Sequence, residues 1–186
     1  IVCYERCWIV KQVAVVECND YNMHKVDAAI EECLIRLGGL EKFIKPGMKV
    51  LLKCNLLMRK KPEECTTTHP AVVAAVARKV QEVGAVPIIG DSPGGLYTKS
   101  VLRIVYNASG MSQVAKETGA KLNYNTDFVE VAHPEGKVVK RLTVIKILEE
   151  VDAVISLSKL KTHGMTLFTG AVKNLFGVIP GTTKAE

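Results

Sequence analysis

KVLLKC, at Lys49–Cys54, is a short apolar run with a turn-forming Pro46-Gly47 just before it. Nearly continuous apolar runs of this length are typical of strands that are buried on both faces of a parallel sheet. Two further runs of the same kind follow, Ala85–Ile89 (AVPII) and Asp152–Leu157 (DAVISL). A helix beginning at Pro70 is predicted between the first two runs. This alternation of strands and helices predicts an α/β fold, with a mainly parallel, Rossmann-like sheet flanked by helices.

Weaker patterns predict the elements around these strands. Apolar residues at helical spacing begin at Val26 and stop before Gly38-Gly39, which predicts one more helix. The stretch QVAVVEC predicts a first strand at Gln12–Cys18. Three more elements are expected: a helical stretch at Lys99–Thr118, a hairpin that pairs Phe128–Ala132 with Val138–Thr143, and a short helix at Thr169–Gly177.

Length and composition fit a single α/β domain spanning residues 1–186. Apolar residues make up 48% of the chain and charged residues 24%, which is ordinary globular composition. No apolar run reaches the roughly 18 residues that a membrane helix needs, and the first ten residues lack the apolar core of a signal peptide. We therefore expect a soluble, cytoplasmic protein with no membrane partner.

The net charge of +6 would attract anionic ligands or nucleic acid. Aromatic residues are only 5% of the chain and are not interleaved with the basic ones, so nucleic-acid binding is a minor alternative. The six cysteines include one C-x3-C pair, Cys3 and Cys7, which is a weak metal signal, and no iron–sulfur ligand run. No metal site is predicted, and the standard dinucleotide and P-loop motifs are absent from the sequence.

Polar residues gather where the three apolar strands end. They are Lys53 and Asn55 after the first strand, Asp91 and Ser92 after the second, and the run Ser156–His163 after the third. Open α/β sheets bind ligands just beyond the carboxyl ends of their strands, so we expect these residues to line one crevice. Asp91 would orient a lysine, bind a sugar hydroxyl or ligate a metal; the alternative is a turn residue that bonds its own backbone.

Three basic residues alternate within the last of these runs: Lys159, Lys161 and His163. In an extended segment their side chains would point the same way and favour a phosphate or a carboxylate. Their crowding would lower the pKa values of the lysines and the histidine. Lys161 and His163, together with Asp91, are therefore the candidate catalytic residues, suited to proton transfer. The alternative is a solvated charged loop.

The short helix expected near the end of the chain would add a second anion-binding element. Thr169 is its candidate cap, and the N–H groups at a helix N-terminus favour an anion. One side of this helix is too small and polar for core packing, which is why we assign its residues to the ligand site with Thr169. They are Gly170, Lys173 and Asn174. The alternative is a surface face with ordinary glycine caps.

Five separated motifs follow one another along the chain: VLLKCNLL (Val50–Leu57), TTHPAVV (Thr67–Val73), GDSPGG (Gly90–Gly95), LSKLKTHGMT (Leu157–Thr166) and TGAVKNLFGVIPG (Thr169–Gly181). In this order they resemble the family catalogued as domain-of-unknown-function 362, over about Val13 to Glu186. That family usually shows K-P-N where this chain has Lys53-Cys54-Asn55, a departure that places a thiol beside the expected site.

The resemblance implies a prokaryotic cytosolic protein, of a kind often joined to ferredoxin-like modules with two four-iron clusters. This chain carries no such module, so any four-iron cluster would lie in a missing part, and the chain is expected to be the N-terminal part of a longer family domain. The resemblance implies no particular reaction and no other cofactor. We consider three hypotheses: an enzyme doing redox-linked or proton-transfer chemistry on a small anionic metabolite, a non-catalytic module that senses an anion or docks a ferredoxin-like protein, and nucleic-acid binding.

Overall fold

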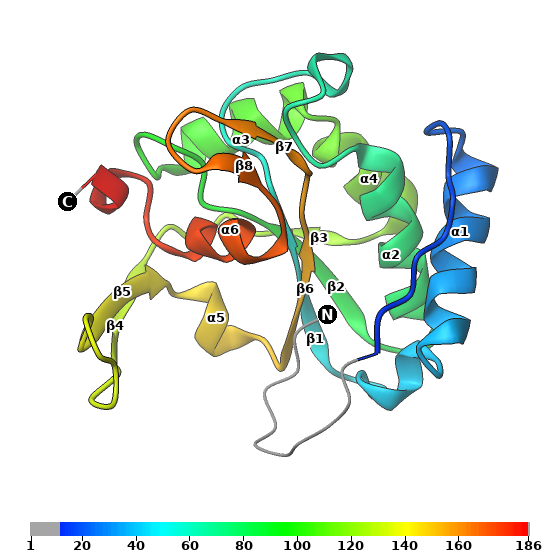
Figure 1. Cartoon of the computed structure of the whole chain (residues 1–186), viewed down its shortest axis with the longest axis horizontal. Coiled ribbons are helices and arrows are strands. Elements are labelled where there is room, and N and C mark those ends of the chain that lie inside the picture. Colours follow the sequence, from blue (N-terminus) through cyan, green and yellow to red (C-terminus); the bar gives the residue numbers. More distant parts are fainter. Residues whose placement is uncertain (1–11, 186) are drawn as a thin grey trace.

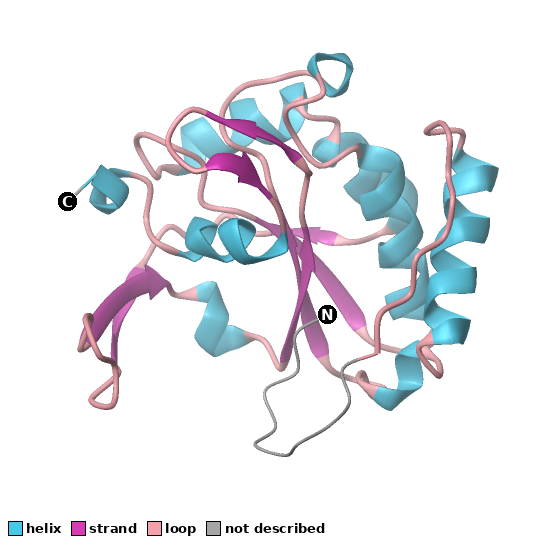
Figure 2. Cartoon of the chain, viewed as in Figure 1, coloured by secondary structure: helices cyan, strands magenta, loops and turns pink. Residues whose placement is uncertain are grey.

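The computed structural model describes residues 12–185, and its centre is one parallel sheet (Figures 1 and 2). The strands of this sheet are β1 (Lys49–Cys54), β2 (Val86–Gly90), β3 (Lys121–Leu122) and β6 (Ala153–Leu157). They lie in the order β3-β2-β1-β6, and every neighbouring pair is parallel. Helices flank the sheet, so the predicted α/β class with a mainly parallel sheet is confirmed.

Helices cover both faces of this sheet. They are α1 (Met23–Arg36), α2 (Pro70–Glu82), α3 (Lys99–Ala108), α4 (Met111–Thr118), α5 (Ile147–Glu150) and α6 (Ala171–Leu175), with 3-10 turns at Leu40–Lys42, Pro62–Glu64, Phe176–Val178 and Thr182–Ala185. Helix α2 packs on β1 and β2, and α1 and α4 pack against α2, while α5 and α6 contact β1 from the opposite side (Figure 1). None of the described helices is both long and apolar enough to cross a lipid bilayer.

Strand β1 occupies the interior of the sheet because its side chains suit apolar surroundings on both faces. Val50, Leu52 and Cys54 are fully buried in the larger core, whereas Leu51 lies in a smaller one on the other face. Successive side chains of a strand point to opposite faces, which explains this division. The smaller core is completed by Ile88, Ile145 and Ile147.

The register of the sheet brings three strand ends to one edge. Lys53 of β1 is paired with Gly90 of β2 and with Ser156 of β6. Because these strands are parallel, the residues that follow them enter neighbouring loops beyond their carboxyl ends. The candidate site is built on these loops.

The predicted strand at Gln12–Cys18 is wrong, because the segment has no regular secondary structure. It runs beside α1 (Figure 1), where the Arg36 guanidinium donates a 3.2 Å hydrogen bond to the carbonyl of Val15. Val13 and Val15 are 83% and 79% exposed. An apolar stretch forms a strand only where a sheet edge offers hydrogen-bond partners, and this segment meets a helix instead.

Two other predictions needed adjustment, and one hairpin was not predicted. The helical stretch at Lys99–Thr118 is two helices, because Gly110 adopts a φ of 79° that favours glycine and separates α3 from α4. The hairpin is present as β4 (Phe128–Ala132) and β5 (Arg141–Ile145), with its second strand later in the sequence than expected. A second hairpin, β7 (Lys161–His163) with β8 (Leu167–Thr169), was not predicted.

Helix α6 packs its polar side into the interior. The predicted helix at Thr169–Gly177 is a five-residue α-helix continued by a 3-10 turn. Its polar side faces inward, since Asn174 is 2% exposed, and its apolar side faces outward, since Val172 is 86% exposed. The prediction that the polar side is unsuited to packing in the interior is therefore wrong. The strand ends beneath α6 carry a buried lysine and carboxylate, which need polar partners.

Candidate functional site

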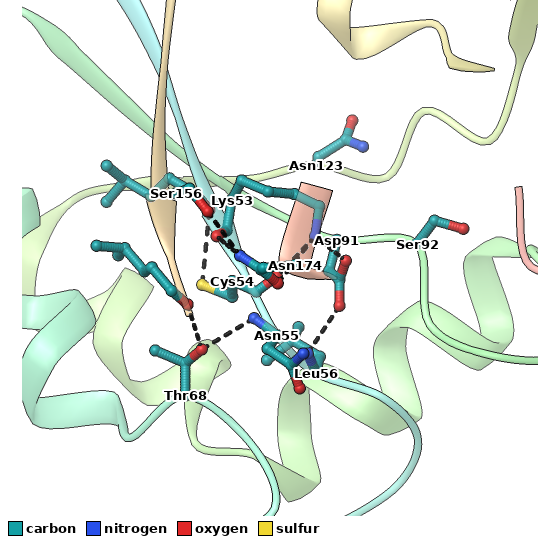
Figure 3. Close-up of polar contacts among 12 residues, drawn as sticks. Lys53, Cys54, Asn55, Leu56, Thr68, Asp91, Ser92, Asn123, Ser156 and Asn174 are labelled. Carbon is teal, nitrogen blue, oxygen red and sulfur yellow. Dashed lines mark hydrogen bonds and ion pairs between the residues drawn. The ribbon is translucent and has the colours of Figure 1, made fainter. Parts of the chain in front are cut away.

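A buried ion pair forms the centre of the candidate site (Figure 3). Lys53, at the end of β1, pairs with Asp91, which follows β2, and their side chains are 0% and 4% exposed. The Lys53 ammonium also donates to the carbonyl oxygen of Cys54 at 2.8 Å, and the second Asp91 oxygen accepts from the Leu56 N–H at 2.7 Å. Both charges are therefore compensated inside the protein. Of the roles considered for Asp91, orienting a lysine is the one that the structure shows.

Helix α6 covers this ion pair. The Asn174 amide donates to the Lys53 carbonyl oxygen and to the Ser156 hydroxyl, both at 3.0 Å, and its oxygen lies 3.5 Å from the Lys53 ammonium nitrogen (Figure 3). A Cβ atom at Gly177 would lie 2.5 Å from that nitrogen and 2.7 Å from Asp91 Oδ1, so only glycine allows this close approach. Lys53, Asp91 and Asn174 are thus enclosed by the fold and bound to one another.

Thr68 joins the ends of β1 and β6. Its hydroxyl accepts from the Asn55 N–H at 2.9 Å and donates to the Leu157 carbonyl at 2.6 Å (Figure 3). A threonine before a proline-initiated helix predicts capping of that helix, but α2 is capped by His69, whose Nδ1 accepts from the Ala71 N–H at 3.2 Å. Sequence reasoning did not assign Thr68 to the site, although a run of three threonines was a visible signal.

Lys161 contacts Asn55, another residue that was predicted to line the crevice. Its ammonium donates to Asn55 Oδ1 at 2.6 Å and to the Thr66 carbonyl oxygen, both of which are neutral. Burial is the main cause that lowers the pKa of Lys161, and the charges of Lys159 and Lys173 lower it further. The pKa of Lys161 is therefore lowered, as the sequence predicted, but burial contributes more to this than crowding by the like charges does.

The three alternating basic side chains have separate partners. Lys159 donates to the Tyr21 hydroxyl at 2.9 Å, and the Tyr21 ring stacks on His69 with ring centroids 3.7 Å apart. His163 Nδ1 accepts from the Met165 and Thr166 N–H groups at 3.1 and 3.2 Å, which fixes the turn of the β7–β8 hairpin. Lys159 and His163 therefore have local contacts that do not involve the buried ion pair.

Lys184 is a site residue that sequence reasoning missed. Its ammonium donates to the Ser92 carbonyl oxygen, and burial lowers the pKa of Lys184 to about 8, with smaller contributions from Lys53 and Lys173. The Ser92 side chain is buried, and its hydroxyl has no hydrogen-bond partner among the described residues. Lys184 stands in no recognisable motif, so only the three-dimensional structure could place it here.

The residues expected to form an anion site at α6 have other contacts in the structure. The Thr169 hydroxyl donates to the Lys159 carbonyl at 2.9 Å and does not cap α6, and Gly170 occupies the cap position without a side-chain bond. Lys173 lies over the Phe176 ring, with its ammonium 4.7 Å from the ring centroid. Five helical residues also align few peptide dipoles, so the N-terminus of α6 attracts anions only weakly.

Comparison with known proteins identifies the family. The family described as "Domain of unknown function (DUF362)" matches residues 50–186, which is most of the chain. The chain belongs to the DUF362 family. This confirms the resemblance that the five sequence motifs suggested.

One relative of this DUF362 domain is "Thylakoid-associated protein sll1697" of Synechocystis sp. (strain ATCC 27184 / PCC 6803 / Kazusa). The two are 37% identical over 182 residues, which is 95% of this chain and 53% of the relative. The chain therefore spans about half the length of that relative. The comparison with solved structures found no match.

Cys54, which replaces the proline usual in the family, belongs to the core and not to the site. It is fully buried, and its thiol contacts the Leu52 carbonyl oxygen at 3.5 Å. Burial raises the pKa of this thiol, so it remains protonated and unreactive. In the part of the chain that the structure describes, no three His, Cys, Asp or Glu side chains are grouped so as to hold a metal ion. The Cys3–Cys7 pair lies outside the described residues.

A surface hollow of this DUF362 domain is lined by none of the residues of the buried ion pair. Its volume is about 780 Å³, and it is lined by the loop Arg59–Glu64 and by α3 residues such as Asn107. Within that loop, Lys60 pairs with Glu64 at 2.7 Å. At the strand ends, by contrast, Lys161 and Lys184 donate only to neutral oxygen atoms.

Proposed function

We propose that this DUF362 domain binds a small anionic ligand, a phosphate or carboxylate compound, beyond the carboxyl ends of β1, β2 and β6. One observation carries the proposal: among the described residues, Lys161, Lys173 and Lys184 form no ion pair, and Asp91 already pairs with Lys53. Lys161 and Lys184 both interact electrostatically with Asp91 and with Lys173, so these charges lie around one region. The excess positive charge favours an anion there.

The energetics of two of these lysines support the same conclusion. Lys161 and Lys184 are partly buried and donate only to neutral oxygen atoms, namely those of Asn55, Thr66 and Ser92. Burial disfavours the ammonium form and is the main cause that lowers both pKa values, and it outweighs the Asp91 carboxylate, which raises them. A bound anion would supply the missing charge.

If the domain is an enzyme, Lys161 and Lys184 are the groups suited to proton transfer. A pKa of about 8 leaves part of the Lys184 population neutral at physiological pH, so its amine is able to accept a proton. Asp91 and His163 are less suited, because Asp91 is engaged by Lys53 and Leu56 and His163 by the hairpin turn.

The test is a thermal-shift and calorimetric titration with inorganic phosphate, sulfate and citrate. A ligand at about 100 times its dissociation constant stabilises a protein by about 2.7 kcal/mol. We expect stabilisation of the native sequence that is weakened in Lys161→Gln and Lys184→Gln, and retained in Lys116→Gln, whose side chain is exposed in the last turn of α4. Equal stabilisation of all four proteins, or none by any anion, would contradict the proposal.

Proton linkage gives an independent readout. An anion bound near Lys184 raises the pKa of its amine, so at about pH 8.5 binding takes up protons. The calorimetric enthalpy should then vary with the ionisation enthalpy of the buffer. In Lys184→Gln this variation should disappear; if it persists unchanged, another group takes up the proton.

A second candidate function is association with an anionic membrane surface, favoured by the outward-facing apolar residues of the β7–β8 hairpin and α6. No Asp or Glu occurs between residues 153 and 185, so this surface carries one sign of charge. The Synechocystis relative is named as thylakoid-associated, which supports the same candidate. The exposed apolar residues are Leu160, Met165, Leu167, Phe168 and Val172.

Vesicle sedimentation separates this candidate from the first. Binding to phosphatidylglycerol vesicles, weaker for phosphatidylcholine, should be lost in Phe168→Ser and kept in Ile35→Ser, a control on α1 with a 66% exposed side chain. No sedimentation with either lipid would exclude the membrane. A ferredoxin with two four-iron clusters, titrated in solution, would then test the docking hypothesis for the same surface.

A further inference from the structure

We infer that the ligand carries two anionic groups, one bound beside Lys161 and the other beside Lys184. This inference rests on the proposed function and specifies its ligand class: a bisphosphate, a phosphorylated carboxylate or a dicarboxylate. It follows from the way in which the two ammonium groups are distributed around the buried Lys53–Asp91 pair.

The first subsite lies where β1 ends and the loop before α2 begins. The Lys161 ammonium is held there by Asn55 Oδ1 and the Thr66 carbonyl oxygen. The next residue, Thr67, is 1% exposed, and its hydroxyl has no hydrogen-bond partner among the described residues. A buried hydroxyl without a partner is costly, so the Thr67 hydroxyl is a candidate donor to an anionic oxygen at this subsite.

The second subsite lies where β2 ends. The Lys184 ammonium is held by the Ser92 carbonyl oxygen, and the Ser92 hydroxyl, in a residue 1% exposed, has no partner among the described residues. The same combination therefore occurs twice: an ammonium bound only to neutral oxygens, and a buried hydroxyl without a partner. The hydroxyl belongs to the residue whose carbonyl accepts from the ammonium, as in Ser92, or to the next residue, as in Thr67. Two independent loops supply the two combinations.

The buried ion pair separates the two subsites. Figure 3 shows Ser92 on one side of Asp91, with Asn55 and Thr68 on the other. Asp91 acts on the pKa values of both Lys161 and Lys184. Asp91 raises both pKa values and Lys173 lowers both, so these two charges lie near both subsites. The two ammonium groups are held by different loops of this positively charged region.

A ligand with one anionic group would neutralise one end of this region and leave a partly buried ammonium at the other. Because a partly buried charge without a partner is unfavourable, a ligand that reaches both ends gains more than either contact alone provides. Linking two binding groups also makes the second contact intramolecular. The geometry thus favours a ligand with two separated anionic groups.

The test compares inorganic phosphate with probes that carry two anionic groups: 3-phosphoglycerate, fructose 1,6-bisphosphate and the dicarboxylates from malonate to adipate. We expect one two-group probe to bind the native sequence, one molecule per chain, at least about tenfold more tightly than phosphate. Lys161→Gln and Lys184→Gln should each remove that advantage, whereas Lys116→Gln should keep it. Each lysine variant should still bind phosphate at its remaining subsite.

Ser92→Ala is a second, milder variant, since it removes only a hydroxyl. It should weaken the best two-group probe and leave the phosphate bound beside Lys161 unchanged. The inference is overturned if every two-group probe binds no more tightly than phosphate, or if either lysine variant abolishes phosphate binding altogether, because both lysines would then serve one anion. Absence of binding by phosphate and all probes to the native sequence would instead overturn the proposed function itself.

Discussion

The buried Lys53–Asp91 pair makes a quantitative prediction about stability. Lys53→Met keeps the length of the side chain and removes its charge, which leaves the Asp91 carboxylate, 4% exposed, with one hydrogen bond from the Leu56 N–H. Removing one partner of a buried ion pair costs about 3–5 kcal/mol. Stability of a whole domain is about 5–15 kcal/mol, so the variant should lose a large share of it while remaining measurable.

The assay is urea unfolding followed by circular dichroism, with the free energy of unfolding taken from the midpoint and slope. Lys49→Met is the matched control, because Lys49 lies in the same strand with an exposed side chain, and it should cost less than about 0.5 kcal/mol. The double variant Lys53→Met/Asp91→Asn should recover at least about 1.5 kcal/mol relative to Lys53→Met, since no unpaired charge remains. The reasoning is refuted if Lys53→Met costs no more than Lys49→Met, or if the two changes in the double variant are additive.

Three further predictions concern the surroundings of this pair. Gly177→Ala should lower the free energy of unfolding by about 1–3 kcal/mol through overpacking. Gly170→Ala is the control and should be nearly neutral, because no atom lies within 4 Å of its Cβ position. Equal losses of stability in the two variants would contradict this prediction. In native protein the buried Cys54 thiol should react with a thiol reagent far more slowly than the exposed Cys65, and equal rates would show that the strand end opens. Because Lys184 has a lowered pKa in the folded state, its side chain binds more protons in the unfolded chain between about pH 8 and 10.5. Its contribution to stability therefore rises with pH in that window, so the slope of stability against pH should be more positive in the native sequence than in Lys184→Gln.

The parts of the fold that local sequence encodes could be predicted. KVLLKC is apolar on both faces, so Lys49–Cys54 was identified with its observed bounds. Pro70 likewise marked the start of α2, and the parallel strands implied that their carboxyl ends meet. These features depend on a few neighbouring residues, which is why a single sequence reveals them.

Features that depend on distant partners could not be predicted. The stretch at Gln12–Cys18 has strand-forming residues but no sheet edge beside it. The polar side of α6 was predicted to be unsuited to core packing, but it faces inward because Asn174 bonds Lys53. Lys184 reaches Ser92 from a position 92 residues away, with no motif to mark it.

The inward polar side of α6 has a consequence for how the molecule opens. A helix held by the hydrogen bonds of Asn174, with Val172 already in solvent, detaches without transferring much apolar surface to water. Such a segment unfolds locally at a lower free energy than the whole domain. Its backbone amides should therefore exchange with deuterium sooner than those of β1. Each local opening of α6 uncovers the ion pair while the core stays intact. The rate at which solvent reaches Lys53 and Asp91 would therefore be set by the local opening of helix α6.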